Sequence, residues 1–125
     1  MRPAEAPAFL RPIIARLSSA FAPESIVLFG SYAKGNARPG SDVDLLVVAR
    51  LAGDPDSHVV RARQLVAGAF PPVDVVLCTP EDVLEAGPPM ARSPFLQSVL
   101  ENGVTVYRPG VPPLVRPLIG AMTGL

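Results

Sequence analysis

The chain has 125 residues, with 11 basic and 11 acidic side chains, so its formal net charge is zero. Its length suits one domain with one core, and its balanced charge disfavours a dedicated nucleic-acid binder, which needs an excess of Lys and Arg. The only cysteine, Cys78, excludes an internal disulfide and a thiolate zinc cage, so we expect a reducing, cytoplasmic location.

The beginning of the chain predicts a protein that is neither exported nor inserted in a membrane. MRPAEAPAFLRPIIARL has no continuous apolar region ahead of a cleavage site, and no stretch reaches the roughly 18 uninterrupted apolar residues of a membrane span. Many of the 16 prolines lie in the first dozen residues and in YRPGVPPLVRPLIGAMTGL. We therefore expect a single domain over residues 1–110 and a Pro-rich apolar tail over 111–125.

The first half of the domain predicts two helices and two strands. IIARLSSAF, residues 13–21, repeats apolar side chains at helical spacing. SIVLF, residues 25–29, is a short apolar run with β-branched residues and predicts a strand. Residues 31–37 can form a short helix that the RPGS turn ends. DVDLLVVA, residues 42–49, is the second predicted strand.

The second half continues the alternation. PDSHVVRARQLVAGAF, residues 55–70, predicts a helix, and PVDVVLC, residues 72–78, predicts the third strand. TPEDVLEAG, residues 79–87, and SPFLQSVLENG, residues 93–103, open with helix caps and end in glycine, and VTVY follows as the last strand. The apolar face of the helix over 55–70 should consist of Val59, Ala62, Val66 and Phe70. This order predicts an α/β (α+β) fold, a small mixed β-sheet flanked by helices.

Two aspartates stand one residue apart at the head of the second predicted strand. Side chains at i and i+2 leave the same face, so Asp42 and Asp44 are aligned. Their repulsion and desolvation are costs unless a cation sits between them, and paired carboxylate oxygens suit magnesium. If the third strand lies beside the second, Asp74 joins the pair. Three carboxylates could hold two divalent ions, an arrangement that favours in-line phosphoryl displacement and hence nucleotidyl transfer.

The residues before this pair predict a phosphate-binding segment. Gly30 lets the backbone approach a ligand closely, and Ser31 offers a hydroxyl and an N–H at the start of a short helix. Gly35 and Gly40 permit the tight turns that would return the first aspartate to this serine. Lys34 could add a point charge to a triphosphate.

GSYAKGNARPGSDVDLLVV resembles the signature of the DNA polymerase beta-like nucleotidyltransferase superfamily, and within it the minimal nucleotidyltransferase group is similar in size. The resemblance covers residues 24–78 and implies transfer of a nucleoside monophosphate to a hydroxyl with two magnesium ions. By this resemblance the aspartate pair would bind both metals, and Asp74 would bind one and act as base. Gly30 and Ser31 would hold the triphosphate. Lys34 stands where many minimal members have arginine, so a point charge replaces a planar fork.

Plainer interpretations stand beside these. An Asp-x-Asp after a Pro-Gly-Ser turn can be a solvated strand entry, and Asp74 can be an edge-strand aspartate that faces water. Ser31 can cap its helix, which is compatible with phosphate binding because both use the same N–H groups. His58 has no partner at metal-ligand spacing, so we expect it at the surface.

The acceptor of the transferred group requires a surface outside the motif. Larger members of the superfamily carry extra domains for the acceptor, so we expect a second protein chain to supply it here, with PPLVRPLIGAMTGL as a docking segment. Minimal nucleotidyltransferases are often paired with HEPN-type ribonucleases in toxin–antitoxin modules, and some modify the toxin with AMP. The resemblance therefore implies an antitoxin with a HEPN partner, and leaves self-association open.

Three hypotheses follow. The first is an active magnesium-dependent enzyme that transfers AMP from ATP to a hydroxyl of the partner. The second is an antitoxin that masks its partner without catalysis. The third is a nucleotidyltransferase for a small molecule such as an aminoglycoside, which would need an acidic pocket. PEDVLE is the only acidic cluster outside the motif, so the third ranks last.

Overall fold

The computed structural model describes residues 7–85 and 93–110, and each predicted strand is found within these ranges. The elements, in chain order, are the 3₁₀-helix η2 (Ala8–Leu10), α1 (Arg11–Phe21), β1 (Ser25–Phe29), α2 (Ser31–Lys34), β2 (Val43–Val48), α3 (Pro55–Val66), β3 (Val73–Cys78), α4 (Pro80–Glu85), α5 (Pro94–Asn102) and β4 (Val104–Tyr107).

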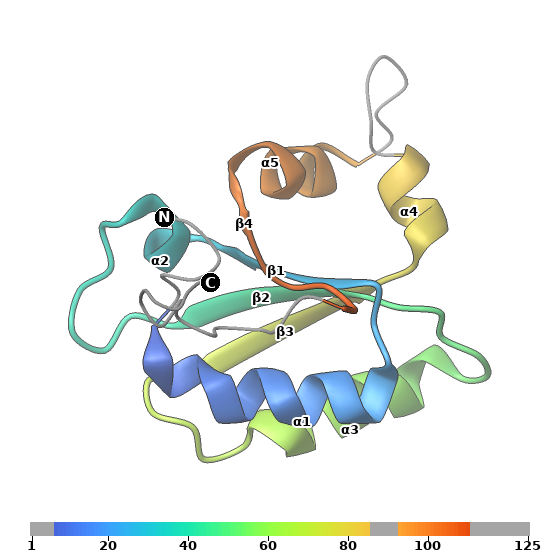
Figure 1. Cartoon of the computed structure of the whole chain (residues 1–125), viewed down its shortest axis with the longest axis horizontal. Helices are drawn as coiled ribbons and strands as arrows, with labels where there is room; N and C mark the ends of the chain where they lie inside the picture. Colours follow the sequence, from blue (N-terminus) through green and yellow to red (C-terminus); the bar gives the residue numbers. More distant parts are fainter. Residues whose placement is uncertain (1–6, 86–92, 111–125) are drawn as a thin grey trace.

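The four strands form one mixed sheet in the order β3-β2-β1-β4. β1 pairs antiparallel with β2 and with β4, whereas β2 and β3 are parallel. Helices α1 and α3 lie along one face of the sheet, and α5 lies on the opposite side (Figure 1). The predicted fold class, a small mixed sheet flanked by helices, is confirmed. None of the helices in the described ranges is long and apolar enough to cross a membrane.

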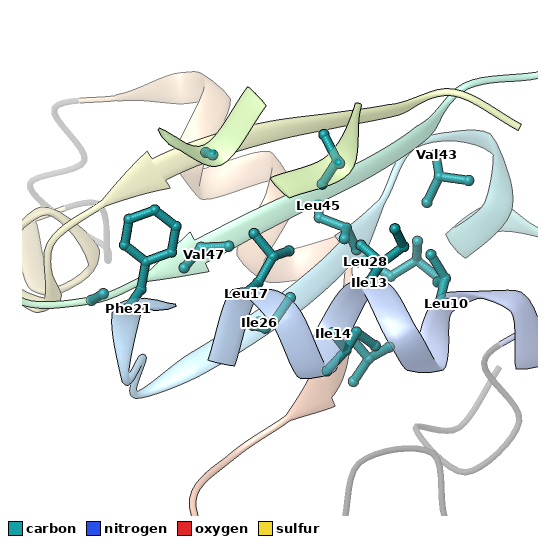
Figure 2. Close-up of a cluster of buried hydrophobic side chains, with 14 residues drawn as sticks. Leu10, Ile13, Ile14, Leu17, Phe21, Ile26, Leu28, Val43, Leu45 and Val47 are labelled. Carbon is teal, nitrogen blue, oxygen red and sulfur yellow. The ribbon is translucent and has the colours of Figure 1, made fainter. Parts of the chain in front are cut away.

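The larger apolar core lies between the sheet and the pair α1 and α3. Ile13, Ile14 and Leu17 recur on one side of α1 and are buried, which is the spacing of an amphipathic helix. Figure 2 shows them directed toward the strand residues of β1 and β2, with Leu28 and Leu45 among those labelled. Alternate strand residues supply this face because successive side chains of a strand point to opposite sides.

A second, smaller cluster covers the other face beneath α5. It consists of the strand residues Val27, Leu46, Val48 and Cys78 and the helix residues Leu96 and Val99. Asp44 precedes Leu46 by two positions on β2 and therefore shares this face. Asp44 therefore lies at the edge of this smaller apolar cluster.

Two helices, α2 and α3, are shorter than predicted. α2 ends at Lys34 instead of residue 37 because Gly35 adopts a left-handed conformation with φ of 79° and caps it. α3 ends at Val66 instead of residue 70 because Ala67 is extended and Gly68 has φ of 79°.

The apolar face predicted for the helix over 55–70 is correct in part. Ala62 and Val66 are buried. Phe70 lies beyond the helix end and is 85% exposed, and Val59 is 38% exposed, so their predicted places on the buried face are wrong. His58, expected at the surface, is half-buried, and its Nε2 lies 2.6 Å from the carbonyl oxygen of Ala52. The predicted helix end at Gly87 and the tail over 111–125 fall outside the described residues.

Candidate active site

The parallel pairing of β2 and β3 places two of the predicted carboxylates side by side. Asp44 and Asp74 are direct partners in the register, and paired residues of neighbouring strands direct their side chains to the same face. On the other side of β2, the antiparallel partner of Asp44 is Phe29, the last residue of β1. A row of Asp74, Asp44 and Phe29 therefore crosses the sheet.

Gly30 and Asp44 are in immediate contact. Gly30 has φ of 76° and ψ of −154°, a conformation that glycine adopts far more easily than other residues. A Cβ atom placed on this glycine would collide with Oδ2 of Asp44. The absence of a side chain at Gly30 is what allows the carboxylate of Asp44 to lie against the turn that opens α2.

The electrostatics of the site centre on Asp44. Its pKa is raised above the ordinary value of 3.8, chiefly by burial and then by the negative charges of Asp74 and Asp42. Asp42 lies just before β2, and both it and Asp74 are exposed, whereas Asp44 is half-buried. The fold thus concentrates negative charge around one partly desolvated carboxylate, which is a cost that a bound cation would offset.

The donor chemistry fits a divalent metal such as Mg²⁺, which prefers carboxylate oxygens. All three aspartates offer oxygen donors, and the like-charge repulsion at Asp44 would be relieved by a cation. Over residues 7–85 and 93–110, however, no three or more His, Cys, Asp or Glu side chains gather closely enough to make a metal-binding group. Asp42 and Asp74 are exposed, so their side chains have room to turn toward a cation beside Asp44.

The predicted phosphate-binding residues adjoin this carboxylate row. Ser31 is the first residue of α2 and is half-buried, while Lys34 ends α2 and is exposed. The N–H of Lys34 donates to the carbonyl of Gly30 at 3.1 Å. A turn in which the N–H of Arg38 donates to Oγ of Ser41 at 2.9 Å then leads the chain back to β2.

Sequence reasoning missed a groove beside this site. It has a volume of about 140 Å³ and is lined by Phe29, Gly30, Lys34, Phe95, Ser98, Val99 and Asn102. The residues from α5 are spaced i, i+3, i+4 and i+7, so they share one side of the helix. That spacing is visible in PFLQSVLEN, but their approach to Gly30 depends on tertiary packing.

Comparisons with known proteins concern the family and the fold of this chain. The profile of the nucleotidyltransferase domain family matches residues 10–98. A solved structure from Sulfolobus solfataricus, provisionally assigned as a nucleotidyltransferase, has a TM-score of 0.57 at 19% identity, covering 81% of this chain and 78% of that one. At this identity the likeness concerns the fold alone.

A second solved structure is the crystal structure of a toxin–antitoxin with AMP-PNP. It has a TM-score of 0.53 at 28% identity, covering 77% of this chain and 71% of that one. No curated protein matches the chain.

Proposed function

Because this chain belongs to the nucleotidyltransferase domain family, we propose that it transfers AMP from ATP to a hydroxyl group of a partner protein in a magnesium-dependent reaction. The observation that carries this proposal is the contact row in which Asp44 lies between Asp74 and the glycine that opens α2. The row places carboxylates beside the backbone turn that opens α2. Carboxylates to hold a metal and N–H groups to bind phosphate are the two halves of a phosphoryl-transfer site.

Each of the three aspartates has a role in this proposal. Asp42 and Asp44 would hold magnesium, with Asp74 completing the set; the resemblance of the motif implies two ions. When bound, the metal would offset the negative charge that develops on the phosphate oxygens. Asp74 is exposed and would take the proton of the acceptor hydroxyl. The acceptor oxygen forms a bond to the α-phosphorus as the bond to the β-phosphate oxygen breaks, and pyrophosphate leaves.

The triphosphate would lie along the start of α2. The backbone at Gly30 and the hydroxyl and N–H of Ser31 would donate to its oxygens, as N–H groups at a helix start do. Lys34 would add a positive charge. This half of the site would bind the leaving pyrophosphate. Removing its hydrogen-bond donors or its positive charge should therefore lower the affinity for ATP as well as the rate of transfer.

The identity of the donor and the partner rests on the neighbour with AMP-PNP. That structure is a toxin–antitoxin, and AMP-PNP differs from ATP only in the atom that bridges the β and γ phosphates. By this likeness we propose that the donor is ATP and that the chain acts with a protein partner. The resemblance of the motif to minimal nucleotidyltransferases suggests further that the chain is the antitoxin of a HEPN-type toxin, and its single cysteine suggests that it works in the cytoplasm. The domain over residues 1–110 would carry the catalysis and residues 111–125 would dock the partner.

The test measures label transfer to the protein encoded beside this chain. The two proteins are incubated with MgATP labelled on the α-phosphate, and protein-bound label is counted. We expect Asp44→Asn to lower transfer by about 100-fold or more, the loss typical of removing one electrostatic stabiliser of a transition state. Asp56→Asn, an exposed aspartate on α3, is the control and should transfer normally. Undiminished labelling by the Asp44 variant would contradict the proposal.

One observation favours the masking antitoxin as a second candidate. A solved neighbour is a toxin–antitoxin, and an antitoxin can neutralise its toxin by binding alone. In this case an Asp42→Asn, Asp44→Asn double variant would still protect cells from the partner toxin. Failure of the double variant to protect, with its fold and binding to the toxin intact, would exclude masking alone.

The small-molecule alternative gains nothing from the structure. The acidic cluster of α4 is engaged locally, because Oδ2 of Asp82 accepts the N–H of Thr79 at 3.0 Å and Glu81 pairs with Arg50 at 3.3 Å. An acidic pocket for a polycation would need these carboxylates free.

A further inference from the structure

We infer that the groove between the end of β1 and α5 binds the nucleobase of the triphosphate, with the ring of Phe95 as its stacking surface. This inference rests on the proposed function, because it concerns the same substrate. It assigns a role to Phe95, Ser98 and Asn102, which belong to no part of the carboxylate and phosphate site described above.

The position of the groove supports this assignment. It shares Phe29 and Gly30 with the candidate active site: Phe29 is the register partner of Asp44, and Gly30 lies against the carboxylate of Asp44. The groove therefore opens on the side of Asp44 that is opposite Asp74. A nucleotide with its α-phosphate at Asp44 could extend its base into the groove and leave the Asp74 side to the acceptor.

The size of the groove also suits a base. Sites that enclose a whole drug-sized ligand measure about 300 to 1,000 Å³, whereas this groove measures about 140 Å³. It can hold one flat ring system but not a complete nucleoside triphosphate. The remainder of the nucleotide would lie outside it, over the carboxylates and α2.

The lining is aromatic and partly exposed. The rings of Phe29 and Phe95 meet edge to face, with centroids 5.5 Å apart and planes at 79°. Phe95 nevertheless remains 47% exposed, so its ring has surface left for stacking. Together with Val99, these rings form apolar walls, which would favour a heteroaromatic base over a phosphate group deprived of its water. Lys34 also lines the groove, from the α2 side on which the triphosphate would lie.

The polar end of the groove can hydrogen-bond a base. Nδ2 of Asn102 donates to the carbonyl of Ser98 at 3.0 Å, a bond that holds the side chain in place. Its amide keeps Oδ1 as an acceptor and a second N–H as a donor. The exocyclic amino group of adenine could donate to Oδ1, in keeping with ATP as the donor.

The test is calorimetric titration of the full chain with MgATP, MgGTP and magnesium tripolyphosphate, which has the phosphates but no base. Phe95→Leu removes the aromatic surface on which the base would stack. We therefore expect this variant to bind MgATP about 10-fold more weakly and tripolyphosphate with unchanged affinity. Asn102→Ala should weaken the binding of MgATP and leave the affinity for tripolyphosphate unchanged, because it removes a hydrogen-bond partner of the base. Leu100→Ala is the matched control, because Leu100 is an exposed apolar residue of α5 outside the groove lining. Circular dichroism checks that each variant is folded.

The outcomes separate this inference from the proposed function. If the wild-type chain binds MgATP and Phe95→Leu binds it equally well, the groove does not hold the base, while the nucleotidyltransferase proposal stands. Equal affinity of the wild type for MgATP and magnesium tripolyphosphate would also overturn the inference, because the base would then contribute nothing. If the folded wild type binds none of the three, both fail together.

Discussion

Gly30 and Asp44 constrain one another at the scale of single residues. A Cβ on Gly30 would collide with Oδ2 of Asp44, and the glycine also has a positive φ. We expect Gly30→Ala to lower the free energy of unfolding by about 2 to 5 kcal/mol, from backbone strain and overpacking together. Because the substitution must also displace Asp44, nucleotidyl transfer should be lost. Urea unfolding and the label-transfer assay measure the two effects.

Gly35 provides the matched control for this substitution. It has a similar φ of 79°, but a Cβ there would meet no atom within 4 Å. Gly35→Ala should therefore cost only about 1 to 2 kcal/mol of left-handed strain and keep most of the transfer activity. Equal loss of activity in the two variants would mean that the collision with Asp44 is irrelevant.

Cys78 gives a pH-dependent prediction. Burial, and then the charge of Asp82, raises its pKa from 9.0 to about 11. Between these values the folded protein keeps a proton that the unfolded chain releases, so the free energy of unfolding falls as pH rises from 9 to 11. We expect this decrease to be larger by about 1 to 3 kcal/mol in the wild type than in Cys78→Ala. Parallel curves for the two proteins from urea unfolding at each pH would contradict it.

The residues of the candidate site differ in how far the sequence alone predicts their positions. The spacing of Asp42 and Asp44 predicts that their carboxylates lie near one another, and the charge of Asp42 does act on Asp44. β2 begins only after Asp42, however, so the strand alternation behind the prediction covers Asp44 but not Asp42. The place of Asp74 depended on which strands pair, and only the parallel register sets it opposite Asp44. Phe95 and Asn102 could not be assigned to the site, because nothing local brings α5 next to Gly30.

At the scale of elements, local chemistry explains the successes and the errors. The strands over SIVLF and VTVY have the predicted bounds, and α5 begins after Ser93 and ends before Gly103 as its caps indicate. The end of α3 was missed because apolar residues continue at helical spacing beyond Val66. The extended Ala67 and left-handed Gly68 end the helix regardless, so backbone conformation there prevails over periodicity.

The N-cap of α5 supports a prediction for that element. Oγ of Ser93 accepts the N–H of Leu96 at 3.2 Å, and loss of such a cap costs about 1 kcal/mol. Ser93→Ala should therefore lower the free energy of unfolding by that amount and weaken MgATP binding, since α5 forms one wall of the groove. Ser93→Asp keeps an acceptor and should restore both in urea unfolding and calorimetry. Equal destabilisation by the two substitutions would show that the cap contributes little.

For the whole molecule, the two faces of the sheet are unequally covered. α1 and α3 together cover one face and enclose the larger core, whereas the cluster beneath α5 is small. α5 also leaves Phe95 and Leu100 exposed. Regions with few buried apolar contacts open at lower free energy than the core. The side of the molecule that would bind ATP is therefore the less stable side.

Native-state hydrogen exchange tests this asymmetry. The amide of Val99 in α5 should exchange with an opening free energy at least about 1 kcal/mol below that of Leu17 in α1, although both residues are buried in helices. MgATP should narrow the difference between the two opening free energies, because a base stacked on the exposed face of Phe95 would stabilise the closed form of α5 against β1 and contribute less to α1. Equal opening free energies for the two amides in the absence of MgATP would mean that α5 and α1 unfold with the sheet as one cooperative unit. In that case nucleotide binding could not order α5 selectively, and the groove would have to be a fixed feature of the fold.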